Sequence, residues 1–91
     1  MDFDRDSARL NDPALASVRA LAIARGGRAI AITGHGDATS SDPLDQEKAV
    51  TLGLARAQAL ATALVAQGVP YAMLRLNAES AGRGANVRLL Q

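Results

Sequence analysis

The chain has 91 residues, which suits one domain spanning residues 1–91 and is too short for two. It contains no cysteine, which excludes disulfides and thiolate metal sites. The net charge is +1, the charges are mixed along the chain, and Phe3 and Tyr71 are the only aromatic residues. Because nucleic-acid binders use basic faces and aromatic stacking platforms, nucleic acid is not an expected partner.

The N-terminal part predicts a strand at Met1 to Asp4, followed by a helix. We expect Asp12 to cap that helix and Pro13 to take its first helical position, because this pair is typical of helix starts. The two glycines at 26–27 predict its end.

The middle of the chain predicts a strand over Arg28 to Thr33, since Ile30 and Ile32 alternate with small residues. A second helix is predicted to begin at Ser41-Asp42-Pro43 and to stop at the Gly-Val-Pro of 68–70. Gly53 interrupts this helix at a cost of about 1 kcal/mol relative to alanine, so we expect that a local contact requires a small residue there.

Two further strands are predicted at Tyr71 to Leu76 and at Asn86 to Gln91. The order β-α-β-α-β-β predicts an α+β fold, a two-layer α/β sandwich with one mixed sheet and two helices packed on one face. The sequence lacks a recognisable signal peptide, and we expect no apolar run of membrane-spanning length. The start Met1-Asp2-Phe3 is typical of a domain cut from a longer protein, and a natural short protein is the alternative.

The segment Gly34-His35-Gly36-Asp37 leaves a predicted buried strand and leads to a capped helix. Ligands in such sheets gather beyond the carboxyl ends of strands, near helix N-termini. Asp37 is the first acidic group at that edge, and Arg56 follows on the next helix. An aspartate and an arginine that face one cleft can hold a zwitterion by its ammonium and its carboxylate.

These residues resemble a known signature. Gly34-His35-Gly36-Asp37, followed by Leu52-Gly53-Leu54-Ala55-Arg56-Ala57, is similar to the G-H-T-D … L-S-x-x-R-A pattern of OmpA-like domains and to the L-G-x-x-R-A variant of peptidoglycan-associated lipoproteins. The segment 83–89 resembles the R-x-x-N-R-R-V close of that family, and Phe3 with residues 7–10 resembles its opening. The four pieces occur in order over nearly the whole chain.

The resemblance implies non-covalent binding of the diaminopimelate residue of a peptidoglycan stem peptide, without catalysis, cofactor or metal. Asp37 would take the amino group and Arg56 the carboxylate, with help from backbone amides near Ala38 and Thr39. We expect Arg56 to contribute little to stability. The remaining residues that the resemblance implies support the site: Gly34, His35, Leu52, Gly53, Ala57 and Arg88.

The resemblance also implies a cell-wall anchor on the periplasmic side of a Gram-negative-type envelope. The parent would be a larger outer-membrane protein, lipoprotein or motor-associated protein. Direct membrane insertion of this domain is not expected, and homo-oligomerisation is left open.

Three departures from the family pattern favour an alternative. Ala49 stands where the family usually has asparagine, and Val87 stands where it has the first of two arginines. The interval from Asp37 to Arg56 is longer by about four residues, which we interpret as one added helical turn over Pro43 to Gln46. The alternative is a degenerate OmpA-like domain that serves protein interaction or oligomerisation without binding peptidoglycan.

Other interpretations of single residues also remain. Asp37 alone could cap a turn, and Arg56 alone could be a solvated helix arginine. His35 has no second histidine or cysteine to complete a metal site, so we expect a hydrogen-bonded structural role for its ring. An enzyme is not expected, because no residues form a general acid and base pair.

Overall fold

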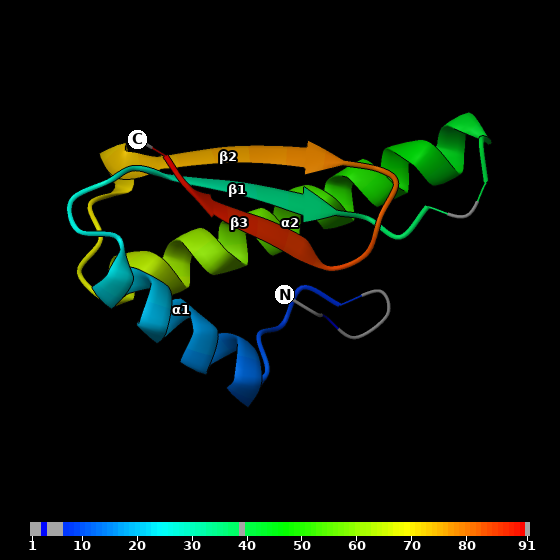
Figure 1. Cartoon of the computed structure of the whole chain (residues 1–91). Coiled ribbons are helices and arrows are strands. Elements are labelled where there is room, and N and C mark those ends of the chain that lie inside the picture. The colour runs from blue at the N-terminus through cyan, green and yellow to red at the C-terminus, as the bar shows by residue number, and fades with distance from the viewer. Residues whose placement is uncertain (1–2, 4–6, 39, 91) are drawn as a thin grey trace.

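The computed structural model describes residues 3, 7–38 and 40–90. Its elements follow one another with short connections (Figure 1). They are the helices α1 (Asp12–Ala24) and α2 (Pro43–Ala66), the 3-10 turn η1 (Tyr71–Met73), and the strands β1 (Ile30–His35), β2 (Leu74–Glu79) and β3 (Ala85–Leu89).

The described strands form one mixed sheet in the order β2-β1-β3. β1 runs parallel to β2 and antiparallel to β3. The predicted α+β fold with one mixed sheet and two helices is therefore confirmed. The strand predicted at Met1 to Asp4 lies outside the described residues, apart from Phe3.

The helix boundaries follow from local capping chemistry. Asp42 caps α2, because its carboxylate accepts from the Leu44 amide at 2.9 Å. At α1 the prediction is wrong by one residue: Asn11 is the cap, since its side chain accepts from the Ala14 amide at 2.9 Å. The expected extra turn over Pro43 to Gln46 is helical, and it projects beyond the edge of the sheet (Figure 1).

The strand boundaries differ from those predicted, because pairing extends or ends each strand. β1 begins and ends two residues later than expected, since its ladder with β2 continues to His35 opposite Glu79. The segment 71–73, predicted as strand, is a 3-10 turn in which the Met73 amide bonds to the Pro70 carbonyl at 2.9 Å. The last strand begins at Ala85, one residue earlier than predicted.

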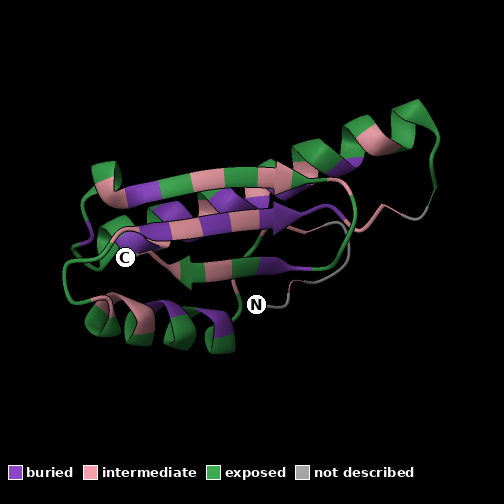
Figure 2. Cartoon of the chain, turned by 45° about the horizontal axis from the view of Figure 1, so that its top comes forward, coloured by how far each residue is buried: buried purple, intermediate pink, exposed green. Residues whose placement is uncertain are grey.

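One aliphatic core joins both helices to the sheet. Val18 of α1, Ile30 and Ile32 of β1, and Leu60 and Leu64 of α2 are almost fully buried in the same cluster. Side chains alternate along a strand, so Ala31, between the two isoleucines, faces the opposite, open side of the sheet. Figure 2 shows that the buried positions concentrate on β1 and on the inner sides of the helices.

By length and composition alone, α2 is long and apolar enough to cross a membrane, contrary to the expectation from the sequence. In the fold this helix lies across the sheet and supplies much of the core (Figure 1). This packing accounts for its apolar composition.

Candidate functional site

Three glycines bring α2 against the carboxyl end of β1. A Cβ added at Gly34 would lie 1.7 Å from the Gly53 carbonyl oxygen, and one added at Gly36 would lie 1.8 Å from the Ala49 carbonyl oxygen. A Cβ at Gly53 would meet the Gly34 oxygen at 2.6 Å. No side chain fits between the two backbones, which explains the glycine inside α2 and confirms the expected need for a small residue there.

This close approach carries Arg56 into the interior. Its side chain is 0% exposed. Nε donates to the Ser7 carbonyl at 2.8 Å, and one terminal nitrogen donates to the His35 carbonyl at 2.6 Å. The guanidinium also lies 5.2 Å from the centre of the Phe3 ring, within the range of a cation–π contact.

The other terminal nitrogen of Arg56 donates to Oδ2 of Asp37 at 2.9 Å. The structure thus brings together the two residues that the sequence singled out, and it pairs them with each other. Because Arg56 is buried and bonded to several acceptors, it helps to hold the fold. This geometry reverses the expectation that it contributes little to stability.

Asp37 lies in the first turn of the loop after β1, with a left-handed φ of +59°. Its amide donates to the Gly82 carbonyl at 2.9 Å, which fixes this conformation. The side chain is 24% exposed, and Oδ1 is buried without a hydrogen-bond donor among the described residues. Left-handed backbone is costly for a side chain other than glycine and is often found at functional sites.

The surroundings of Asp37 keep its carboxylate ionised. The hydrogen bond from Arg56 lowers the pKa of Asp37 below its ordinary value of 3.8, and burial opposes that shift. The charges of Arg56 and Arg83 lower this pKa further. A negative charge is therefore held at this point over the whole physiological pH range.

His35 ties the loop 80–84 to the end of β1. Its Nδ1 lies 2.9 Å from the Ala81 carbonyl oxygen, which can only accept, so Nδ1 carries the proton. Nε2 lies 3.0 Å from the side-chain nitrogen of Asn86 and accepts from it. The ring is buried and has partners on both nitrogens, as the structural role expected for it requires.

Gln46, in the added turn of α2, connects the two loops beside Asp37. Its side-chain nitrogen donates to the Ser40 carbonyl at 2.6 Å, and its side-chain oxygen accepts from the Ser80 hydroxyl. The Ser80 carbonyl in turn accepts from the Ala38 amide at 2.9 Å. The added turn therefore braces the loops on both sides of it through Gln46.

The other predicted site residues fall into two groups. Ala57 is buried beside Gly34, and Leu52 is half-buried on α2. Both belong to the part of α2 that packs closely against β1. Ala38 belongs to the loop, but its amide is already bonded within the protein. Thr39 lies outside the described residues.

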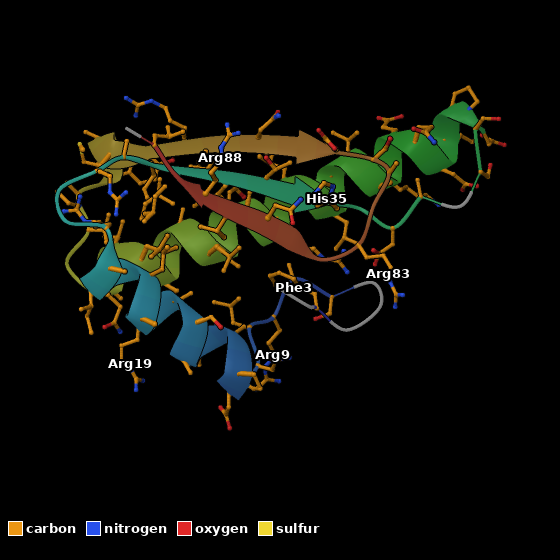
Figure 3. The ribbon with its side chains drawn as sticks, viewed as in Figure 1. Phe3, Arg9, Arg19, His35, Arg83 and Arg88 are labelled. Atoms are coloured by element: carbon orange, nitrogen blue, oxygen red, sulfur yellow. The ribbon has the colours of Figure 1, made fainter. Side chains whose placement is uncertain are left out.

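Arg88 does not join this site. It pairs with Ala31 and is exposed on the open side of the sheet, four strand residues from His35, which is roughly 13 Å (Figure 3). The sequence implied that Arg88 supports the site, but the structure places it away from Asp37 and Arg56, because only alternate residues of β3 face the core.

Sequence reasoning missed three contributors to the site. Ser7 supplies a carbonyl to Arg56 from 49 positions away, and Gln46 braces the loops through side-chain bonds. Arg83 is exposed on the loop, and its charge acts on Asp37 (Figure 3). Ser7 and Arg83 each lie within a segment that resembles the family pattern, but neither was assigned to the site, and nothing in the sequence indicated the side-chain bonds of Gln46.

The carboxylate of Asp37 is fixed in place, with one oxygen hydrogen-bonded to Arg56 and the other without a hydrogen bond from the described residues. Oδ2 of Asp37 is held by Arg56, whereas Oδ1 is buried, so a ligand ammonium could bond to it only if the surrounding loop moved to admit the ligand. The exposed Arg83 provides positive charge for a ligand carboxylate nearby. Such a pair of charges can recognise a zwitterion.

Comparisons with known proteins agree with this architecture. Residues 2–88 match the model of a family described as the OmpA family. No curated protein sequence matched the chain.

Several solved structures share the fold. The peptidoglycan-associated lipoprotein from Burkholderia pseudomallei is 23% identical, with a TM-score of 0.76 over 98% of this chain and 86% of that one. The C-terminal domain of MotB from Helicobacter pylori is 14% identical, with a TM-score of 0.77 over 98% and 82%. The OmpA-like domain of FopA1 from Francisella tularensis is 14% identical, with a TM-score of 0.78 over 99% and 71%. Identities this low show a shared fold and nothing finer.

Proposed function

The chain belongs to the OmpA family, which is known for peptidoglycan binding, and from this premise we propose that it binds a diaminopimelate-containing stem peptide. The observation that carries the proposal is the burial of the Asp37 oxygen Oδ1 without a hydrogen bond. This oxygen belongs to an ionised carboxylate, it is buried, and it has no hydrogen bond of ordinary geometry from the described residues. The backbone amide of Gly84 lies close enough to this carboxylate to help lower its pKa. Buried polar atoms without a partner are rare in proteins, and a ligand ammonium would complete this one.

In this proposal Arg56 has two tasks. It fixes the carboxylate of Asp37, and it provides positive charge for the carboxylate that shares a carbon with the ligand ammonium. Direct contact between Arg56 and that carboxylate stays a prediction. It requires the ligand to reach a guanidinium that Ser7 and Phe3 cover in the free protein. Arg83 is the exposed cation that the ligand meets first.

The family is non-enzymatic, and we propose that this chain likewise anchors rather than catalyses. We also propose that it acts on the periplasmic side of a Gram-negative-type envelope, as part of a larger protein. The name of one structural neighbour, a peptidoglycan-associated lipoprotein, supports this location.

The test is a titration of the ¹⁵N-labelled protein with a diaminopimelate stem peptide, followed by amide chemical shifts. Binding between μM and mM, about −8 to −4 kcal/mol, should shift the amides of 36–38 and 80–84. Asp37→Ala should abolish these shifts. Asp45→Ala, which removes an exposed acid from the first turn of α2, is the matched control and should leave them unchanged.

A lysine-containing stem peptide provides the second comparison. It lacks the additional carboxylate, so Arg83 and Arg56 lose their partner and we expect at least tenfold weaker binding. If neither peptide shifts any amide at mM concentration, the proposal fails. The alternative, an interaction module that no longer binds peptidoglycan, would then account for the substitution to Ala49 and for the burial of Arg56.

A further inference from the structure

Acidic and basic residues are mixed along the sequence, but in the fold the described acidic residues and a group of arginines lie at opposite ends of the sheet. The described acidic residues lie at or before the start of a helix or at the carboxyl ends of β1 and β2. They are Asp12, Asp37, Asp42, Asp45, Glu47 and Glu79. No acidic residue occurs in the sequence at 13–36 or at 48–78. These two stretches include the end of the sheet that lies opposite Asp37. At that end α1 and α2 finish, and β1 and β2 begin (Figure 1).

Arginines gather at that opposite end. Arg75 and Arg88 both pair with Ala31, from either side, so they flank a small residue on the open side of the sheet. Arg25 and Arg28 occupy the turn between α1 and β1, where Arg28 donates to the Arg25 carbonyl at 3.0 Å. The side chains of Arg25, Arg28 and Arg75 donate to backbone carbonyls. None of the four arginines forms an ion pair with a carboxylate of the described residues.

Two large apolar side chains protrude at the same end. Ile23, in the last turn of α1, is 82% exposed, and Tyr71, at the start of η1, is 65% exposed. Neither contributes to the core cluster. We call this surface the basic tip and define it by six residues: Ile23, Arg25, Arg28, Tyr71, Arg75 and Arg88.

We propose that the basic tip binds an anionic membrane surface. Arginines that face no carboxylate are attracted to lipid phosphates. Exposed Ile23 gains by entering the boundary between headgroups and acyl chains, and tyrosine is favoured at that depth. A phosphate backbone of nucleic acid offers no apolar layer for Ile23, so the combination of charge and apolar side chains favours a lipid surface.

The geometry lets this contact coexist with the ligand site. Asp37 follows the carboxyl end of β1, whereas the basic tip surrounds its amino end. A molecule that binds a membrane by one end of its sheet leaves the other end exposed. The membrane proposal does not depend on the peptidoglycan proposal, and each can fail alone.

The test is co-sedimentation of the chain with vesicles of equal parts phosphatidylglycerol and phosphatidylcholine, against vesicles of phosphatidylcholine alone. We expect binding to the anionic vesicles only, and binding that weakens as salt is raised from about 0.05 to about 0.5 M, because salt screens exposed charges. Equal binding to both vesicles, or to neither, overturns the proposal.

Variants locate the contact. Each arginine near an anionic surface contributes about fivefold in binding, so Arg75→Gln with Arg88→Gln should weaken partitioning about 25-fold. Ile23→Ser should weaken it at unchanged net charge. Arg9→Gln with Lys48→Gln removes the same charge away from the tip and should have at most a small effect.

Thermal unfolding should show each variant folded. Three outcomes contradict the proposal: equal losses in the two double variants, no effect of Ile23→Ser, or binding to poly-glutamate but not to vesicles. The last would identify an acidic polypeptide as the partner.

Discussion

At the carboxyl end of β1, buried polar groups bond to residues distant in sequence. At its amino end most of the charged side chains are exposed, and those that form hydrogen bonds donate to nearby carbonyls. Arg56 is fully buried and reaches Ser7, His35 and Asp37. Arg75 at the other end is exposed and bonds to Ala72. Figure 3 shows the same contrast between enclosed His35 and open Arg88.

The contrast separates two kinds of recognition. Fixed, desolvated groups hold the Asp37 carboxylate in one position, because several partners determine it at once, and our first proposal assigns such a site to a small ligand. Exposed arginines with few constraints suit a diffuse anionic surface, where no particular geometry is required. Substitutions at the two ends should therefore differ most in their effect on stability.

The largest difference is expected for arginine replacements. Arg56→Ala leaves the partly buried carboxylate of Asp37 and two carbonyls without their donor, which should cost about 3–5 kcal/mol of unfolding free energy. Arg19→Ala, on the exposed surface of α1, should change it by less than about 0.5 kcal/mol. Urea denaturation measures both. Similar values for the two variants would show that the buried network contributes no net stability.

Glycine replacements come next. Gly34→Ala forces a Cβ into the Gly53 carbonyl and must separate α2 from β1, at a cost of about 3 kcal/mol. Gly27→Ala, in the turn near the basic tip, has a positive φ of 87° but open space around its Cβ, so it should cost about 1 kcal/mol. Thermal unfolding of the two variants compares the effect of a steric clash with that of backbone strain. Equal losses of stability would mean that α2 and β1 can move apart to accept the Cβ at little cost.

The same contrast explains what the sequence could predict. The helix starts were predicted almost to the residue, because Asn11, Asp42 and the following prolines act locally. Strand ends were not, since β1 extends to His35 only through pairing with Glu79. The Asp37–Arg56 pair was recognised from a motif.

The burial of Arg56 could not be predicted, because Phe3 and Ser7 cover it from far away in sequence. The mixed order of charges along the chain likewise concealed the basic tip, which appears only when the turn after α1 meets the starts of β1 and β2.

A smaller effect is expected at the brace between the two loops. Gln46→Ala removes the bonds to Ser40 and Ser80, which should lower stability by about 1 kcal/mol. Hydrogen exchange at the Ala38 amide should accelerate more than exchange in the core. Gln58→Ala, exposed on α2, is the matched control. Unchanged exchange at Ala38 would show that the brace does not order the loop.

The smallest effect is expected in how the free energy of unfolding depends on pH. The pKa of Asp37 is lowered in the folded protein, mainly by its hydrogen bond from Arg56, so its contribution to stability is complete above the unfolded value of about 3.9. That contribution disappears as pH falls through the lower, folded pKa. Urea denaturation between about pH 6 and pH 2 should therefore show a steeper loss in the wild type than in Asp37→Asn. The exposed Asp45→Asn should follow the wild type. Parallel curves for the wild type and Asp37→Asn would mean that Arg56 stabilises the loop through its bonds to carbonyls, and that the carboxylate serves the ligand alone.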